Sequence, residues 1–152
     1  MRLITALVLT LTIAVQPVQA PGILQIPAPV IDQKQEHPDL DLLARLITAE
    51  AKGECLTGQV AVGSVVLNRV ADPRFPDTIN GVIFEPRQFQ PVWQGTLPDK
   101  AGETSREAAR MALEGDNPVS DALYFYHIEL ASCDWIRSRE TVVDIGVHRF
   151  AR

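Results

Sequence analysis

The stretch ARLITAEAKGE, which runs from Ala44 to Glu54, places a glutamate on the face of a helix that should be buried. At helical spacing, the apolar stripe of this helix consists of Leu43, Leu46 and Ile47. Glu50 falls in the middle of the stripe, although an ionised carboxylate is costly to remove from water. Gly53 predicts that the helix ends within one turn of Glu50, where a cleft can begin.

Two interpretations of Glu50 are compatible with this pattern. In one, apolar surroundings raise the pKa of its carboxyl group, which then carries a proton near neutral pH and can act as a general acid. In the other, the side chain lies at the edge of the stripe and extends to water, and periodicity alone favours this second interpretation. Glu54, one turn further on, is predicted to contact a ligand in the same site, although a solvated loop acid or a helix cap explains it equally well.

The composition is that of an ordinary globular protein. The 152 residues are enough for one domain with a substantial core. Of these residues, 46% are hydrophobic and 22% are charged, which is usual for a globular protein. The formal net charge of -5 disfavours a nucleic-acid groove or an anionic membrane surface as a partner. We therefore expect one monomeric domain without a nucleic-acid partner.

Residues 1–20 have the pattern of a signal peptide. Arg2 provides a positive charge, the run from Leu3 to Val15 is apolar, and Val18-Gln19-Ala20 is a small-residue cleavage site. The apolar run is shorter than the roughly 20 residues that a membrane span needs. We therefore expect export to the periplasm or cell envelope, with no stable membrane span after processing. Residues 21–38, which are rich in proline, are expected to form a linker.

Residues 39–152 are expected to form the folded domain, and their pattern is mainly helical. The run VAVGSVVLNRV is rich in β-branched residues, which suit a strand, but its length without a turn favours a buried helix capped by Thr57. The expected class is α+β, with a small antiparallel sheet late in the chain. Helices are expected over residues 39–52, 58–70, 77–84 and 103–114 and strands over 122–127 and 141–146, with 147–150 continuing the last strand after a glycine bend and 85–97 irregular.

Two parts of this domain carry groups suited to a sugar substrate. Cleavage of a glycosidic bond by a carboxyl group needs a groove whose aromatic and amide side chains contact sugar faces and hydroxyl groups. The irregular stretch supplies Gln88 and Phe89, and the strand ALYFYH places Tyr124 and Tyr126 on one face. Trp135 either lines the cleft or covers a disulfide. We predict that all five contact the substrate.

The two cysteines fit an exported protein with one disulfide, between Cys55 and Cys133. The alternative is a reactive thiol at Cys55, just before a helix whose dipole favours a thiolate. His127 or His148 would then be its base, as in a cysteine peptidase or amidase. No local sequence signature of such enzymes surrounds Cys55.

A zinc site is not predicted. Catalytic zinc is usually held by three protein ligands. The histidines His37, His127 and His148 show no HExxH-type spacing, and His37 lies in the linker. We therefore expect neither a metal nor another cofactor.

Six sequence blocks occur in order between about Leu40 and Phe150: ARLITAEAKGE, GQVAVGSVVLNRV, PRFPDTINGVI, QFQPV, ALYFY and IGVHRF. In these blocks the chain resembles the SleB-type cell wall hydrolases, the spore cortex-lytic enzyme family. The resemblance implies a lysozyme-like catalytic domain that cuts the glycan strands of peptidoglycan. It also implies that Glu50, the glutamate of the AExxGE block, is the catalytic acid. Cys55 and Cys133 are not part of the family pattern.

The resemblance further implies the reaction of a lytic transglycosylase. In such enzymes a single glutamate protonates the bond between N-acetylmuramic acid and N-acetylglucosamine and then acts as a base. The sugar's own 6-hydroxyl group attacks and gives a 1,6-anhydro product. One acid without an evident partner fits this mechanism better than hydrolysis by two carboxylates, so a hydrolytic muramidase or glucosaminidase is the alternative. A wall-binding or inhibitor module on the same scaffold, with Glu50 merely buried, is a further alternative.

Overall fold

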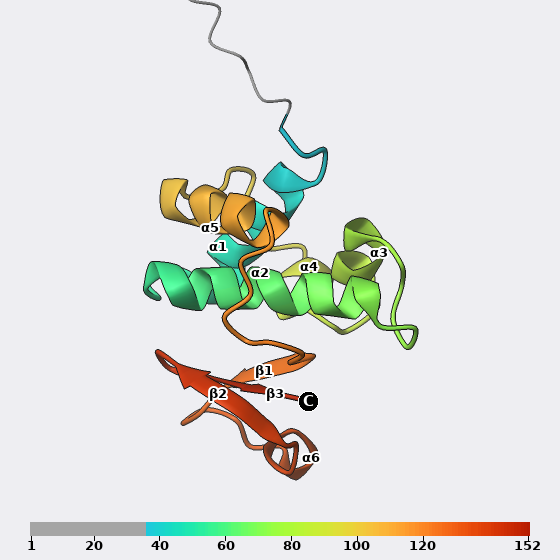
Figure 1. Cartoon of the computed structure of the whole chain (residues 1–152), viewed down its shortest axis with the longest axis vertical. Helices are drawn as coiled ribbons and strands as arrows, with labels where there is room; N and C mark the ends of the chain where they lie inside the picture. The colour runs from blue at the N-terminus through green and yellow to red at the C-terminus, as the bar shows by residue number, and fades with distance from the viewer. Residues whose placement is uncertain (1–35) are drawn as a thin grey trace, which may run out of the picture. The chain divides into compact units, whose positions relative to one another are not determined.

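The chain forms six helices and a small sheet in the part that the structure describes, residues 36–152 of this computed structural model (Figure 1). The predicted signal peptide and nearly all of the predicted linker lie outside these residues, so both stay predictions. The predicted α+β order, mainly helical with a late antiparallel sheet, is confirmed. The helices are α1 (Leu40–Ala51), α2 (Leu56–Ala71), α3 (Ile79–Phe84), α4 (Gln90–Trp93), α5 (Glu103–Leu113) and α6 (Asp134–Arg137), and the strands are β1 (Tyr124–His127), β2 (Thr141–Ile145) and β3 (His148–Ala151).

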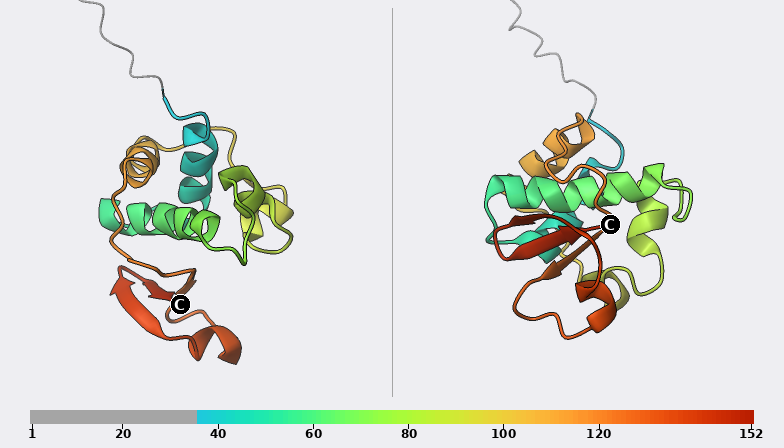
Figure 2. Two further views of the ribbon diagram at one scale, coloured as in Figure 1. Left: turned by 45° about the vertical axis from the view of Figure 1, so that its right-hand side comes forward. Right: turned by 60° about the horizontal axis from the view of Figure 1, so that its bottom comes forward.

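Helix α2 is the centre of the fold. Its residues from Gly58 to Val66 are all buried, and so is Arg69 near its end. Figures 1 and 2 show α2 between the sheet on one side and α1 and α5 on the other. A helix that is apolar all around is stable only where it is enclosed. Burial here outweighs the strand preference of the valines, and the predicted buried helix is confirmed.

Helix α2 begins earlier than predicted. The backbone N–H of Gln59 already donates to the carbonyl oxygen of Cys55, at 3.1 Å, so Cys55 occupies the N-cap position and the predicted cap at Thr57 is wrong. The side-chain amide of Gln59 donates to the carbonyl oxygen of Glu54 at 3.0 Å and accepts from the hydroxyl of Ser105 at 2.8 Å. This polar side chain is therefore satisfied although it is buried.

Gly63 lies where α2 meets both α1 and α5. A β-carbon added there would lie 3.1 Å from Cβ of Ala112 in α5 and 3.1 Å from Cδ1 of Ile47 in α1. These distances are tighter than ordinary van der Waals contact. The three helices therefore pack at a point where no side chain fits without a shift.

We expect Gly63→Val to destabilise the domain by roughly 1–3 kcal/mol, because the added methyl groups overfill a packed core. Thermal unfolding of the whole chain measures the effect. Ala71→Val, at the exposed end of α2, is the control for the lower helix preference of valine. Equal melting temperatures for the two variants would contradict close packing at Gly63.

The sheet has the strand order β1-β3-β2 and is antiparallel throughout. The prediction that residues 147–150 continue the last strand is wrong. The chain reverses at Gly146, whose φ of 59° lies in the left-handed region, and β3 then returns beside β2. The glycine bend is therefore the turn of a hairpin rather than an irregularity in one strand.

The two faces of the sheet have different surroundings. Phe125 lies opposite Phe150 on one face, and Phe150 is fully buried, so this face covers the core. Tyr126 lies opposite Arg149 on the other face, where both are more exposed than Phe150. The alternation predicted for the strand ALYFYH is therefore confirmed.

The helices α4 and α6 are not predicted from the sequence. Helix α4 lies within the stretch predicted to be irregular and has a proline in its first turn. Helix α6 follows Cys133. Each has four residues, which are too few to show a helical period.

Candidate active site

Glu50 lies at the C-terminal end of α1, one residue before the last. The helix ends there because Lys52 has an extended conformation and Gly53 follows with a φ of 101°. The side chain of Glu50 is half-buried, and its Oε1 atom is buried without a hydrogen-bond partner in the described part of the chain. The predicted helix end is confirmed, and the buried oxygen argues against a side chain that extends fully to water.

Burial raises the pKa of the Glu50 carboxyl group, because an ionised carboxylate loses its hydration there. The negative end of the α1 dipole acts in the same direction. No ion pair joins Glu50 to a cationic side chain among residues 36–152. A raised pKa favours the protonated form, which can donate its proton to a substrate as a general acid does.

Glu54 lies beneath the turn between β2 and β3. Its side chain is 10% exposed, and Oε1 accepts a hydrogen bond from the N–H of Val147 at 3.3 Å. A β-carbon at Gly146 would lie 1.8 Å from Glu54 Oε2, so only glycine permits this close approach. Glu54 therefore joins the loop between α1 and α2 to the hairpin. Its contact with a substrate stays a prediction.

His148 is buried next to the Glu54 carboxylate. Its Nδ1 lies 3.3 Å from Glu54 Oε1, within ion-pair distance, but makes no hydrogen bond of normal geometry in the described residues. Burial lowers the pKa of His148 and is the largest effect on it. The charge of Glu54 raises this pKa, and His127 lowers it further. The imidazole is therefore neutral at neutral pH.

Arg69 is buried at the end of α2 and connects this helix to the sheet. Its side chain donates to the carbonyl oxygen of Leu123 at 2.7 Å and to Gln88 Oε1 at 3.2 Å. Its guanidinium carbon lies 5.2 to 5.7 Å from the centroids of three aromatic rings, those of Phe75, Phe89 and Tyr124. Sequence reasoning missed Arg69 because an arginine near the end of a helix is usually explained by the helix dipole.

Glu85 is a second acidic side chain with a buried oxygen. It follows α3 directly, and its Oε2 has no hydrogen-bond partner in the described part of the chain. Its carboxylate interacts electrostatically with Arg69. No signal in the sequence distinguishes Glu85, because it stands in a stretch without periodicity.

Three of the predicted substrate-binding residues belong to one network around Arg69. Gln88 is held by the hydrogen bond from Arg69, and Tyr124 lies under its guanidinium. The ring of Tyr124 meets that of Trp135 edge-on, with centroids 5.4 Å apart. Trp135 is 53% exposed, so its ring is available to a ligand.

The other two predicted contacts have different surroundings. The ring of Phe89 also lies beside the Arg69 guanidinium, but it is only 2% exposed and packs on the ring of Phe125, so it belongs to the core in this structure and not to a binding surface. A phenylalanine next to glutamines gave no signal that a distant strand would cover it. Tyr126 is half-buried on the outer face of β1, opposite Arg149.

The predicted disulfide is absent from the structure, because Cys55 and Cys133 are both free and exposed. Cys55 precedes α2 and Cys133 precedes α6, and Figure 1 shows the sheet between these two helices. A disulfide needs Cα atoms within about 7 Å of each other. Trp135 consequently does not cover a disulfide, and its contact with a substrate stays a prediction.

The groups that cysteine or zinc chemistry needs are not assembled in the described residues. A nucleophilic cysteine needs a base within hydrogen-bond reach. His148 faces Glu54, His127 Nδ1 accepts the N–H of Glu129 at 3.3 Å, and no contact joins Cys55 to either imidazole in residues 36–152. Within the same residues, no group of three or more histidine, cysteine and acidic side chains is arranged to hold a metal ion.

A desolvated carboxyl group and exposed aromatic side chains are groups that enzymes acting on glycans use. The family model described as Cell Wall Hydrolase matches residues 53–151. The chain therefore belongs to the cell wall hydrolase family, and the resemblance predicted from the sequence blocks is confirmed. The matched segment starts just after Glu50 and includes Glu54, Arg69 and the whole sheet.

Two spore cortex-lytic enzymes show the similarity in sequence. The enzyme from Oceanobacillus iheyensis is 39% identical over 126 residues, which are 83% of this chain and 46% of that protein. The enzyme from Bacillus subtilis is 42% identical over 112 residues, which are 74% of this chain and 37% of that protein. The chain thus spans less than half the length of these two relatives.

Two solved structures share the fold. The catalytic domain of the Bacillus cereus SleB protein matches with a TM-score of 0.71 at 40% sequence identity, over 75% of this chain and 89% of that chain. The catalytic domain of the germination-specific lytic transglycosylase SleB from Bacillus anthracis matches with a TM-score of 0.73 at 37% identity, over 80% of this chain and 100% of that chain. These matches confirm the predicted fold, a mainly helical α+β domain like that of the SleB-type hydrolases.

Proposed function

We propose that this domain cleaves the glycan strands of peptidoglycan as a lytic transglycosylase, at bonds between N-acetylmuramic acid and N-acetylglucosamine. Glu50 is the acid and the base of this reaction. The observation that carries the proposal is its half-buried carboxyl group at the end of α1, whose pKa is raised by burial. The description of the similar Bacillus anthracis protein as a lytic transglycosylase supports the reaction type.

The reaction needs one carboxyl group. Protonated Glu50 donates its proton to the glycosidic oxygen, and the bond from that oxygen to C1 of N-acetylmuramic acid breaks. Ionised Glu50 then takes the proton of the 6-hydroxyl group of the same sugar, while the hydroxyl oxygen bonds to C1 and closes the 1,6-anhydro ring. Glu50 is protonated again at the end, and no water is consumed. A raised pKa favours the protonated form that must start the cycle.

The network around Arg69 is proposed to hold the sugar chain. The hydrogen bond from Arg69 fixes the amide of Gln88, and its guanidinium restrains the ring of Tyr124. Side chains that are held in this way bind a ligand at a lower cost in conformational entropy. Trp135 presents an exposed ring that can stack on a sugar face, and Tyr126 stays a further candidate for substrate contact.

Hydrolysis at the same site is the alternative. An inverting hydrolase activates water with a second carboxylate about 6.5–9.5 Å from the acid. Glu54 is engaged with Val147 and His148 and is not free for this role. Glu85 has a buried oxygen, but its charge interacts with that of Arg69. The engagement of both acids favours the transglycosylase.

The products distinguish the two reactions. We expect digestion of purified sacculi in heavy-oxygen water to give 1,6-anhydro ends without the heavy isotope, because the attacking oxygen comes from the sugar. Mass spectrometry of the released muropeptides measures this. A hydrolytic muramidase in the same water is the control for isotope incorporation. Reducing ends that carry heavy oxygen would instead identify this chain as a hydrolase.

We further propose that the domain works as a monomer outside the cytoplasmic membrane, in the periplasm or cell envelope. Its proposed substrate lies there, and residues 1–20 have the pattern of a signal peptide. Among residues 36–152, none of the helices is long and apolar enough to cross a membrane.

A further inference from the structure

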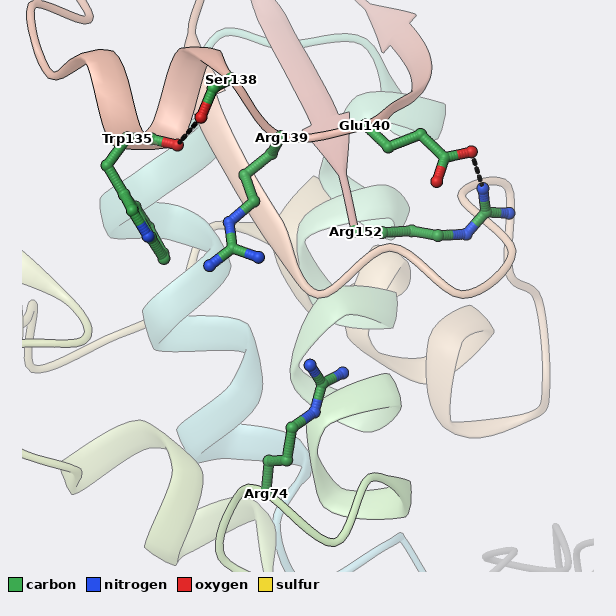
Figure 3. A pocket seen from close by; sticks show the side chains of 6 residues that line it. All are labelled: Arg74, Trp135, Ser138, Arg139, Glu140 and Arg152. Carbon is green, nitrogen blue, oxygen red and sulfur yellow. Dashed lines mark hydrogen bonds and ion pairs between the residues drawn. The ribbon is translucent and has the colours of Figure 1, made fainter.

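A pocket of about 500 Å³ lies between the loop after α2, the segment from α6 to β2 and the end of β3 (Figure 3). Its lining residues are Arg74, Trp135, Ser138, Arg139, Glu140 and Arg152. Three guanidinium groups beside an indole ring are suited to a ligand that has both an anionic and an apolar part. The reaction proposed above uses none of these charged groups.

Of the three arginines in this pocket, Arg139 is the one that forms no ion pair with an acidic side chain of residues 36–152. Its guanidinium carbon lies 4.1 Å from the centroid of the Trp135 ring and 4.8 Å from that of Tyr124. Stacking uses the flat face of a guanidinium and leaves the N–H groups at its edge free to donate. No carboxylate within residues 36–152 forms an ion pair with Arg139. Its donors are therefore available to a ligand.

The other two arginines are oriented by acidic partners. Arg74 donates to both carboxylate oxygens of Asp72, at 2.9 and 2.8 Å, and these hydrogen bonds lower the pKa of Asp72 to about 2. Arg152 donates to Asp121 at 2.6 Å and to Glu140 at 2.7 Å. Each pairing uses only part of the five donors of a guanidinium. Arg74 thus retains donors for a ligand although it is paired with Asp72.

Arg74 and Arg139 come from distant parts of the chain, and their guanidinium groups point toward each other across the pocket (Figure 3). Two like charges that face each other across a gap favour an anion between them. We propose that these two side chains, with the ring of Trp135 as an apolar wall, bind a free carboxylate of a peptide stem of peptidoglycan. This inference rests on the function proposed above, which supplies the substrate.

A peptide carboxylate fits this pocket better than the glycan does. The N-acetylated sugars of the strand between the stems offer no free anionic group, whereas the attached peptides end in carboxylates. A guanidinium matches a carboxylate with two parallel hydrogen bonds, and the exposed indole of Trp135 can cover the aliphatic part of an amino acid. Tyr124 joins the pocket to the Arg69 network, since its ring centroid lies 5.4 Å from that of Trp135 and 5.7 Å from the Arg69 guanidinium carbon.

The first test compares glycan strands that carry peptide stems with strands from which an amidase has removed them. We expect the native chain to prefer the first substrate, and Arg139→Gln to lower the ratio of the two kcat/KM values about tenfold, as for a lost charged hydrogen bond. Arg139→Lys keeps the charge but loses the planar guanidinium with its two parallel donors. Its ratio of kcat/KM values should therefore lie between those of the native chain and Arg139→Gln. Arg137→Gln, exposed in α6 and outside the pocket lining, is the matched control. An unchanged ratio in Arg139→Gln overturns the proposal.

The second test measures binding without cleavage, so that this proposal and the catalytic proposal can fail separately. A soluble stem tetrapeptide, its carboxyl-amidated form and inorganic phosphate are each titrated into the intact chain. We expect the native chain to bind the acidic peptide and to lose this binding when the peptide is amidated, and Arg139→Gln to bind the acidic peptide about tenfold more weakly. This result supports the carboxylate subsite even if the chain cleaves no glycan. No binding of the acidic peptide, equal binding of both peptides, or binding of phosphate alone overturns it.

Discussion

Glu50→Gln is expected to lower the rate of glycan cleavage by roughly 10²–10⁴-fold, the usual contribution of general acid–base catalysis. Glutamine has nearly the same shape, but it can neither protonate the glycosidic oxygen nor accept the proton of the 6-hydroxyl group. Release of soluble muropeptides from purified sacculi measures the rate, and sedimentation with sacculi measures binding, which should persist. Cleavage that survives in the variant would place the acid elsewhere, with Glu85 as the next side chain to replace. A native chain that binds sacculi without cleaving them would be a binding module.

The same substitution should not weaken the fold. Burial raises the pKa of Glu50 above its ordinary value of 4.5, so its carboxyl group stabilises the fold fully below pH 4.5 and loses this effect as the pH rises through the raised pKa. Glu50→Gln should therefore melt at the same or a higher temperature than the native chain at neutral pH, and the advantage should vanish below pH 4.5. Glu129→Gln, an exposed site, is the control. A clear loss of melting temperature at neutral pH would mean that Glu50 has a structural role.

Features that depend on neighbours in the sequence could be predicted. The end of α1 follows from Gly53, whose φ of 101° suits few other residues, whereas periodicity alone favours an exposed Glu50 over the half-buried one that is found. The helical state of α2 follows from a long run without a turn signal, despite its β-branched side chains. In each case the deciding interaction spans only a few residues of the chain.

Features that depend on distant partners could not be predicted. Arg69 binds the carbonyl oxygen of Leu123, 54 positions later, and Glu54 binds the N–H of Val147, 93 positions later. No local pattern distinguishes these side chains from a helix-capping arginine or a solvated loop acid. The separation of Cys55 from Cys133 is likewise a property of the tertiary fold, which the number of cysteines does not reveal.

The contact between Glu54 and the hairpin turn connects two parts of the candidate site. Glu54 stands one turn beyond Glu50, and the turn leads into β3, which pairs with β1 and so with Tyr124. We expect a change at the turn to disturb both stability and activity.

Gly146→Ala is expected to destabilise the domain by about 3 kcal/mol. An alanine with the φ of 59° found here is strained by roughly 1–2 kcal/mol. In addition, its β-carbon would lie 1.8 Å from Glu54 Oε2, so the carboxylate must leave the N–H of Val147 and the side chain of His148. Chemical denaturation of the intact chain measures the loss, and the rate of glycan cleavage should fall with it.

Two further variants separate the backbone strain from the collision with Glu54. Gly95 has a φ of 69° with no atom within 4 Å of an added β-carbon, so Gly95→Ala should cost the strain alone, about 1 kcal/mol. Glu54→Ala removes the colliding oxygen, so in that background Gly146→Ala should cost no more than Gly95→Ala does. The difference between the two backgrounds is the coupling energy of the pair. If Gly146→Ala costs the same with and without Glu54, the carboxylate moves aside freely and does not hold the turn.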